Sequence, residues 1–221
     1  MRGEPSGGRG SSSQRKDGDF PDFYNMKNKY DVVAREKAEA YLGVDNGGTN
    51  DQWEKSLSEE ELKNFTLYTG DYYKQINEAM REKDENSDYW EVAQNLEKSL
   101  NRQTLSKNIT LHRGDDGAIF GVEDMDSEDM YSTMKLLEGT KFSYNNFVST
   151  SPVKPWQEKV QYHIKVPKGK AKGGYVEHFS EFSGERELLL SSKTRFRIDK
   201  VKRADHEING GFVDVYMTVI D

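Results

Sequence analysis

The stretch "EFSGERELLL", residues 181–190, joins a turn to an apolar run and indicates where the core of this protein is anchored. Three consecutive leucines after a glycine-containing turn predict a short buried β-strand. Glu185 and Glu187 stand directly before the leucines, two positions apart. Because side chains alternate along a strand, we expect both carboxylates on one face, roughly 6–7 Å apart. Like charges this close raise the pKa of one partner, so the pair needs a chemical explanation.

The composition is that of one polar globular domain. The 221 residues suffice for a single sizeable core, with 33% apolar and 32% charged residues. A net charge of −7 gives no overall attraction to nucleic acid or to an anionic membrane. No apolar run approaches the ~20 residues of a membrane span, and none at the N-terminus fits a signal peptide. The absence of cysteine excludes disulfides, thiolate catalysis and cysteine metal sites.

The first residues differ in character from the rest. Residues 1–22 are rich in Gly, Ser and charge, and they predict a flexible linker. Their excess of basic side chains also fits an arm that binds a partner. Such a start is expected of a domain excised from, or fused to, a larger protein.

The remaining residues, 23–221, fall into two halves that predict one domain. Residues 23–104 show helical periodicity, and Ser58 followed by Glu61 has the spacing of a capping box. Residues 105–221 consist mainly of short β-rich runs between turn residues. Helices followed by strands are typical of the α+β class.

Acidic residues crowd the stretch 115–129, where a calcium site is one interpretation. Their spacing does not match an EF-hand loop, whereas acids from Asp126 onward suit the start of a helix. The histidines have no metal-ligand spacing either, and His163 and His178 are expected to be ordinary strand residues. We therefore predict no metal. The four histidines are His112, His163, His178 and His206.

Three short motifs carry side chains suited to catalysis and binding. In "LHRG" an arginine closes an apolar strand before a glycine turn, where its planar guanidinium suits phosphate. "FVSTSP" offers three hydroxyl groups that can orient a polar ligand or a neighbouring carboxylate, and "FSGERE" holds the two carboxylates. Taken singly, each motif also fits a plain strand edge or a solvated turn. In order, the motifs supply Arg113 and Gly114; Ser149, Thr150 and Ser151; and Glu185 and Glu187.

Together and in this order, the motifs resemble those of the Arg/Ser/Glu class of mono-ADP-ribosyltransferases, which includes the binary actin-modifying toxins. The likeness extends over residues 25–221, and "LYTGDYYKQINEAMR" resembles the family's helix beside its NAD site. The resemblance implies two facing β-sheets that form an NAD cleft, preceded by a helical layer. It also implies that NAD is consumed as a substrate, with no metal. The Glu-x-Glu motif is the form found in arginine-modifying members.

The resemblance implies a role for each motif residue. Glu187 would be the catalytic glutamate, Ser149 would orient it, and Glu185 would face the incoming arginine; asparagine- or cysteine-modifying relatives carry Gln there. Phe182 would help to recognise the protein substrate. Many relatives have a phosphate-binding Arg after Ser-Thr-Ser; this chain has none, and Lys154 or Lys159 would replace it. The residues implied to bind NAD are Arg113, Gly114, Thr150, Ser151, Asn77 and Arg81.

The expected function is transfer of ADP-ribose from NAD to an arginine of a target protein, with NAD hydrolysis as a side reaction. Actin is the first target that the resemblance implies, and a toxin secreted or delivered into the cytosol of a target cell is the expected setting. One alternative is an NAD glycohydrolase, against which Glu185 argues. The other is an inactive domain that serves as a binding or structural part of a phage or polymorphic toxin protein. A binding role would not require all four motif residues, and the chain retains every one of them: Arg113, Ser149, Glu185 and Glu187.

Overall fold

The structure is a computed structural model that describes residues 18–24, 32–154, 156–182, 184–204 and 211–221. Most of the predicted linker, the start of the first predicted helix and His206 lie outside these ranges. Among the described helices, none is both long and apolar enough to span a bilayer.

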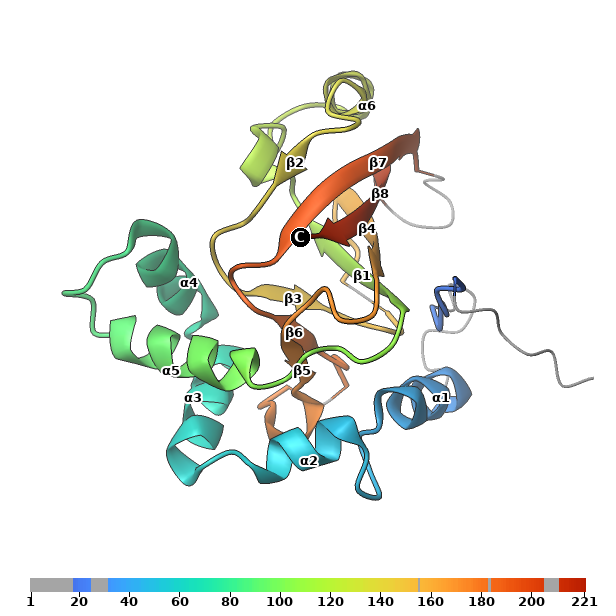
Figure 1. Ribbon diagram of the computed structural model, residues 1–221. Helices are drawn as coiled ribbons and strands as arrows, with labels where there is room; N and C mark the ends of the chain where they lie inside the picture. The colour runs from blue at the N-terminus through green and yellow to red at the C-terminus, as the bar shows by residue number, and fades with distance from the viewer. Residues whose placement is uncertain (1–17, 25–31, 155, 183, 205–210) are drawn as a thin grey trace, which may run out of the picture.

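In the described part of the chain, the first half is helical and the second half holds the strands and one further α-helix, which confirms the α+β class (Figure 1). The first half forms α1 (Val32–Leu42), α2 (Thr49–Lys55), α3 (Glu59–Thr69), α4 (Tyr73–Glu82) and α5 (Trp90–Asn101). The second half forms β1 (Ile109–Asp115), β2 (Lys141–Phe142), β3 (Val148–Thr150), β4 (Val160–Val166), β5 (Gly173–Tyr175), β6 (Leu188–Leu190), β7 (Arg195–Arg203) and β8 (Val213–Ile220). The 3-10 turn η1 (Ala118–Phe120) and the helix α6 (Ser127–Lys135) lie between β1 and β2, and the 3-10 turn η2 (Glu177–Phe179) lies between β5 and β6.

The predicted helix caps are confirmed. The Ser58 hydroxyl accepts the Glu61 N–H at 3.2 Å, and the Glu61 carboxylate accepts the Ser58 N–H at 2.8 Å. The Asp126 carboxylate accepts the N–H groups of Glu128 and Asp129, both at 2.9 Å. Each cap satisfies donors that the first turn of a helix leaves unpaired.

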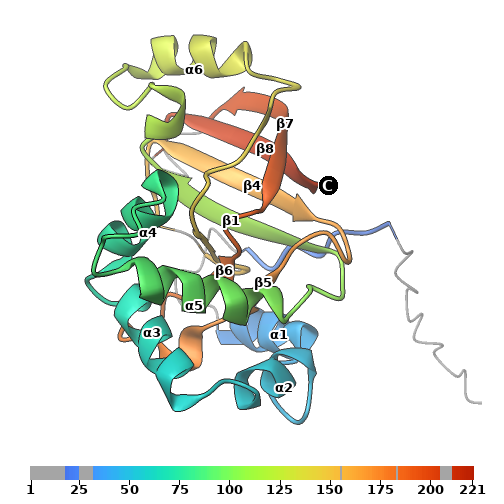
Figure 2. The same cartoon turned by 60° about the vertical axis from the view of Figure 1, so that its left-hand side comes forward.

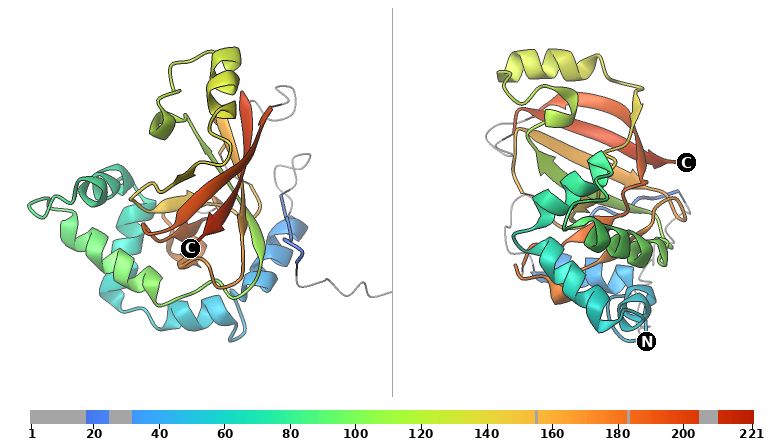
Figure 3. Two further views of the ribbon diagram at one scale, coloured as in Figure 1. Left: turned by 45° about the horizontal axis from the view of Figure 1, so that its top comes forward. Right: turned by 90° about the vertical axis from the view of Figure 1, so that its left-hand side faces the viewer.

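Two sheets form the second half of the fold. The larger has the order β1-β4-β8-β7-β2 and the smaller the order β3-β6-β5. His112 and Ser151 exchange two backbone hydrogen bonds of 2.8 Å, which join β1 to the end of β3. Figure 2 shows α3, α4 and α5 beside the smaller sheet and α6 over the far end of the larger one. This arrangement, also visible in Figure 3, confirms two sheets behind an N-terminal helical layer.

The strand β6 connects the two hydrophobic cores. Leu188 and Leu190 pack into the core that includes the inner face of the larger sheet, while Leu189 packs among the helices against Phe65 and Leu96. All three leucines are fully buried. Burying one leucine side chain stabilises a fold by about 1.5–3 kcal/mol. The predicted buried strand is therefore confirmed for the three leucines.

Two residues of α2, Trp53 and Asn50, attach the helical layer to β5. The ring of Trp53 lies against Gly174, where a Cβ would come within 2.3 Å of the ring. Asn50 adds hydrogen bonds to both backbone groups of Tyr175, at 2.9 and 3.1 Å. A side chain at Gly174 would push α2 away from the small sheet.

The backbone before β6 differs from the prediction. The strand begins at Leu188, and Gly184 and Arg186 have φ angles of 102° and 53°. An extended strand has strongly negative φ values. The expectation that Glu185 and Glu187 share one face of a strand is therefore wrong, because a left-handed turn carries them.

Two smaller predictions are also corrected. Gly114 lies inside β1 opposite Gln161 and forms no turn, so Arg113 does not close its strand. His163 is a strand residue as predicted, with one ring nitrogen 3.1 Å from a ring nitrogen of His112. His178 instead lies in η2, where its ring contacts the Glu54 carboxylate at 3.0 Å.

Candidate active site

A groove between the two sheets brings the three sequence motifs together. It encloses about 270 Å³, part of it open to solvent. One wall comes from β1, a second from β3 and the segment after it, and a third from the turn before β6. The lining residues are His112, Arg113, Gly114, Ser149, Thr150, Ser151, Lys154, Trp156, Glu185 and Glu187.

Arg113 is held in the groove from several sides. Its Nη1 donates to the carbonyl of Ser149 at 3.0 Å, and its Nε donates to Asp115 at 3.2 Å. The guanidinium also lies 5.4 Å from the ring centre of Tyr144. The Tyr162 hydroxyl donates to the other oxygen of Asp115 at 2.9 Å, which fixes that carboxylate. Burial disfavours the charge of Arg113, but Asp115 and the tyrosines outweigh it and raise the pKa of the guanidinium.

The acidic stretch 115–129 supports the site and the helix start. Asp115 orients Arg113, and Asp126 caps α6. Among the residues that the structure describes, no three His, Asp or Glu side chains are grouped as metal ligands would be.

Glu187 is a buried carboxylate, 4% exposed, at the base of the groove. Burial raises its pKa to about 7, although a hydrogen bond with Ser149 and the positive charge of Arg113 oppose that rise. A pKa in this range leaves the carboxylate partly protonated near neutral pH. A cation bound beside it would favour its ionised form.

Glu185 lies at the rim of the groove and is half-buried. Burial, together with the nearby charges of Glu187 and Glu177, raises its pKa to about 7. The charge of Glu187 thus contributes to the raised pKa of Glu185, as predicted, and burial contributes more. Carboxylates whose pKa values lie near 7 can accept protons from a bound substrate at neutral pH.

Ser149 is supported from the helical layer by a chain of polar groups. Its hydroxyl lies 3.5 Å from that of Tyr68, which accepts a hydrogen bond of 3.1 Å from the Asn77 side chain. The Asn77 oxygen in turn accepts the N–H of Phe147 at 3.2 Å. Asn77 therefore braces the site from behind and is not among the groove-lining residues. Arg81 is also outside that set; it reaches the Asn146 side chain at 3.4 Å.

We expect Asn77→Ala to act mainly on stability. The change leaves the buried Phe147 N–H without its acceptor, which lowers the free energy of unfolding by about 1–3 kcal/mol. Denaturant unfolding measures this loss, and Arg81→Ala, on an exposed side chain of the same helix, should change stability by less than about 0.5 kcal/mol. Unchanged stability together with lost NAD binding would contradict the bracing role and favour direct contact with NAD.

The hydroxyls of the Ser-Thr-Ser motif are mostly engaged with backbone. Thr150 donates to the Leu188 carbonyl at 2.6 Å, which ties β3 to β6. The Ser151 hydroxyl accepts the N–H groups of Val153 and Lys154, at 3.3 and 3.0 Å. These two residues shape the groove wall.

Of the two lysines considered as replacements for the missing arginine, Lys154 lines the groove. Lys159 donates to the Glu123 carbonyl and lies over the Phe212 ring, away from the groove. Phe182 is 49% exposed on the turn that carries Glu185.

Sequence reasoning missed several residues of the site. Trp156 lines the groove and is 56% exposed. A Cβ added to Gly114 would lie 2.1 Å from the Trp156 carbonyl oxygen, so the two backbones approach closely there. Tyr68, Tyr144 and Glu177 also support the site from separate elements. The only local signal is that aromatic residues flank the motifs, which is too common to be specific.

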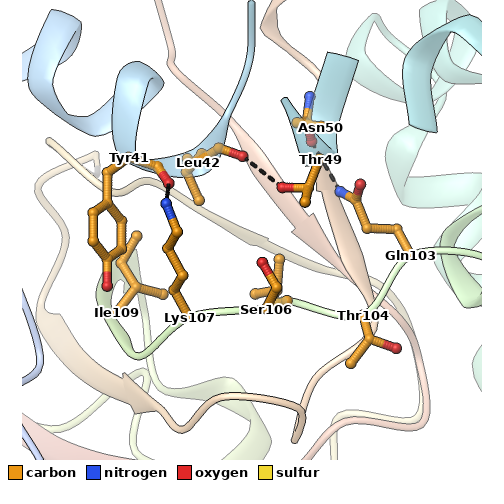
Figure 4. Close-up of a pocket in the computed structure, with 10 residues that line it drawn as sticks. Tyr41, Leu42, Thr49, Asn50, Gln103, Thr104, Ser106, Lys107 and Ile109 are labelled. Atoms are coloured by element: carbon orange, nitrogen blue, oxygen red, sulfur yellow. Dashed lines mark hydrogen bonds between the residues drawn. The ribbon is translucent and has the colours of Figure 1, made fainter. Parts of the chain in front are cut away.

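A second hollow lies between α1, α2 and the segment after α5 (Figure 4). Its polar groups bond one another: Lys107 donates to the Tyr41 carbonyl at 2.8 Å, and Thr49 donates to the Leu42 carbonyl at 3.1 Å. No carboxylate or histidine is among its lining residues. We therefore assign the chemistry to the groove between the sheets.

The fold and the groove have the arrangement expected of ADP-ribosyltransferases of the Arg/Ser/Glu class. A family model described as ADP-ribosyltransferase exoenzyme matches residues 46–218. The chain belongs to that family, and the resemblance drawn from the motifs is confirmed at this level.

Individual relatives agree with this assignment. Mono-ADP-ribosyltransferase C3 of Clostridium botulinum D phage is 30% identical over 121 residues. The match covers 48% of this chain and 47% of that protein, so it spans about half of either length. Plx2a, an ADP-ribosyltransferase toxin from Paenibacillus larvae, is 29% identical with a TM-score of 0.71, over 85% of this chain and 96% of that one. C3stau2 from S. aureus, solved with NAD, has a TM-score of 0.71 at 15% identity, over 92% of this chain and all of that one. The last likeness shows a shared fold.

Proposed function

We propose that this protein cleaves NAD and transfers the ADP-ribose to an arginine side chain of a target protein. The observation that carries the proposal is the grouping of Arg113, Glu187 and Glu185 in one groove. Membership of the exoenzyme family supports the ADP-ribosyl transfer, and the likeness to C3stau2 with NAD supports the choice of donor. The Glu-x-Glu motif supports arginine as the acceptor.

In the proposed reaction, Glu187 acts on the ribose. Breaking the bond between nicotinamide and ribose places positive charge on the sugar, as in glycoside cleavage. A buried carboxylate fixed near that charge stabilises the transition state. Ser149 forms a hydrogen bond with Glu187, and the nearby positive charge of Arg113 favours its ionised form. Arg113, together with Lys154 at the groove wall, supplies positive charge for the two phosphates of NAD.

Glu185 acts on the acceptor. A guanidinium is protonated in water and is a poor nucleophile. A carboxylate at the groove rim can bind it and accept its proton as it attacks the ribose. The bound cation also relieves the repulsion between the two glutamates. Thr150 and Ser151 form the nicotinamide side of the groove, and Gly114 also contacts NAD. Exposed Phe182 contacts the target protein.

The target is a protein of a cell that the toxin enters. Actin is the first candidate, because the motifs resemble those of the actin-modifying toxins. In this proposal the protein is secreted or delivered into the cytosol of the target cell.

The proposal is tested with NAD labelled in its adenine half, the free guanidine agmatine and, separately, a cell lysate. Label on agmatine and on a lysate protein supports transfer to arginine, and purified actin tests the named target. Free ADP-ribose alone indicates an NAD glycohydrolase. No consumption of NAD indicates a binding domain without activity. Either of the last two results would overturn the proposal.

We expect Arg113→Lys to raise the KM for NAD at least tenfold. A lysine replaces a two-bond fork with a single point charge, and it loses the contact with either Ser149 or Asp115. Losing such a hydrogen bond also lowers the free energy of unfolding by about 1–3 kcal/mol. Titration with NAD and denaturant unfolding measure the two effects. Unchanged affinity for NAD would remove Arg113 from the binding site.

A further inference from the structure

Glu177, outside the three motifs, holds the turn that carries Glu185. It begins η2, separated from the end of β5 by Val176 alone, and is half-buried. One of its carboxylate oxygens accepts the N–H of Gly184 and the other accepts the N–H of Arg186, both at 2.5 Å. These two amides belong to the neighbours of Glu185 on either side. A single carboxylate therefore fixes the backbone on both flanks of the acceptor glutamate.

The turn requires such a clamp because its backbone is unfavourable. Arg186 has a φ of 53°, in the left-handed region that non-glycine residues rarely occupy. Gly184, with a φ of 102°, supplies the other unusual conformation. Hydrogen bonds to an ionised acceptor are about twice as strong as neutral ones. Both bonds therefore favour this conformation over an extended path into β6.

The clamp also has a rigid base. The N–H of Val176 donates to the carbonyl of Glu187 at 2.9 Å, which continues the pairing of β5 with β6. Glu177 follows Val176 in the chain, and Val176 is hydrogen-bonded to the backbone of Glu187. Its position is fixed relative to Glu187, and through the turn it fixes Glu185 as well.

The placement of Glu177 has an electrostatic disadvantage. Its negative charge adds to the effect of burial in raising the pKa values of both Glu185 and Glu187. A neutral acceptor such as an amide or a hydroxyl would avoid this repulsion. A third carboxylate is tolerated best where a cation binds, and an arriving guanidinium is such a cation.

We propose that Glu177 is a positioning residue for acceptor specificity: it locks the 184–186 turn so that Glu185 meets the guanidinium, while cleavage of NAD proceeds without it. The inference rests on the proposed transfer to arginine. It assigns to Glu177 no contact with NAD or with the reacting atoms. Without the clamp, Glu185 remains in the chain but no longer has one fixed position at the groove rim.

The test compares Glu177→Gln with Glu181→Gln. Glutamine keeps one acceptor oxygen and places an amide group against the second N–H, so one clamp bond is lost. Glu181 is an exposed carboxylate on the same segment, and its change controls for the loss of one negative charge. Assays run well above pH 7, so that Glu185 and Glu187 are ionised in every variant.

The first measurement is amide hydrogen exchange of the free protein. We expect Glu177→Gln to speed exchange at Gly184 or Arg186 about 10- to 100-fold, the factor that corresponds to one charge-assisted hydrogen bond. The Val176 amide, bonded to Glu187, should keep its protection in both variants. Unchanged exchange at both turn amides would overturn the clamp.

The second measurement separates transfer from hydrolysis. In Glu177→Gln we expect kcat/KM for agmatine to fall at least tenfold while the rate of NAD hydrolysis and the KM for NAD stay unchanged. A purely structural role would lower both activities together, and that result would overturn the positioning role. If the wild-type protein hydrolyses NAD but labels no guanidine, the proposed transfer fails, and the amide exchange then decides the clamp alone.

Discussion

Glu187→Gln is expected to abolish NAD cleavage and ADP-ribose transfer together. The amide keeps the shape of the side chain and can still bond Ser149, but it lacks the charge that offsets the developing ribosyl cation. Removing one such stabilising group typically costs about 10²–10³ in rate. Nicotinamide release measures cleavage, and label on agmatine measures transfer. Near-normal cleavage by the variant would refute the role of Glu187.

The same substitution should make the protein more stable above neutral pH. The pKa of Glu187 is about 7 in the folded protein, against the ordinary value of 4.5. Between these values the folded state binds more protons than the unfolded state, so stability falls as the pH rises. One pKa unit corresponds to about 1.4 kcal/mol, so the full loss above pH 7 is about 3 kcal/mol.

Glutamine carries no charge at any pH and avoids this loss. Glu187→Gln should therefore gain up to about 3 kcal/mol over the wild type at pH 8 and little below pH 4.5. Denaturant unfolding at both pH values measures the difference, with Glu181→Gln as the control for an exposed carboxylate. If the variant is more stable than the wild type at pH 8 but inactive, then the wild-type protein loses stability at this position in order to keep its activity. A variant less stable than the wild type at pH 8 would contradict the burial of an ionised Glu187.

The parts of the fold that the sequence predicts are those set by neighbouring residues. Ser58 and Asp126 cap helices because their oxygens reach amides only two or three residues away. The three leucines predict a buried strand because no exposed position tolerates such a run. The path of residues 184–187 does not follow from its own sequence: "GERE" suits a strand or a turn, and bonds from Glu177 favour the turn.

The site shows the same division. The motifs contain most of the side chains that line the groove. Their resemblance to one enzyme family predicts that they share a single site. Their supporting partners are distant in sequence: Asp115 and Tyr144 hold Arg113, and Glu177 holds the turn of Glu185. Asn77 is predicted to bind NAD, and that role stays a prediction. It belongs to the family's helix motif, yet it contacts Tyr68 and Phe147 behind the groove.

Glu185→Gln is expected to spare NAD hydrolysis and to remove transfer to arginine. Water needs little help in attacking a sugar that already resembles a cation. A guanidinium has to be bound and to lose a proton, and an amide does neither well. General-base catalysis typically contributes about 10²–10⁴ in rate, so the transfer rate should fall by that factor. Free ADP-ribose and labelled agmatine, measured in the same reaction, give the two rates.

The two rates in Glu185→Gln also distinguish the alternatives for this residue. If hydrolysis and transfer fall together, Glu185 supports Glu187 or the bound NAD, and arginine loses its main support as the acceptor. If neither changes, the 184–186 turn is solvated surface and the acceptor is bound elsewhere. Glu181→Gln, on the same segment, shows the effect of losing one exposed charge. One combination of results agrees with our proposal: Glu185→Gln loses transfer but keeps hydrolysis, and Glu181→Gln keeps both. In that case the Glu185 carboxylate serves the acceptor, while Glu187 serves the ribose.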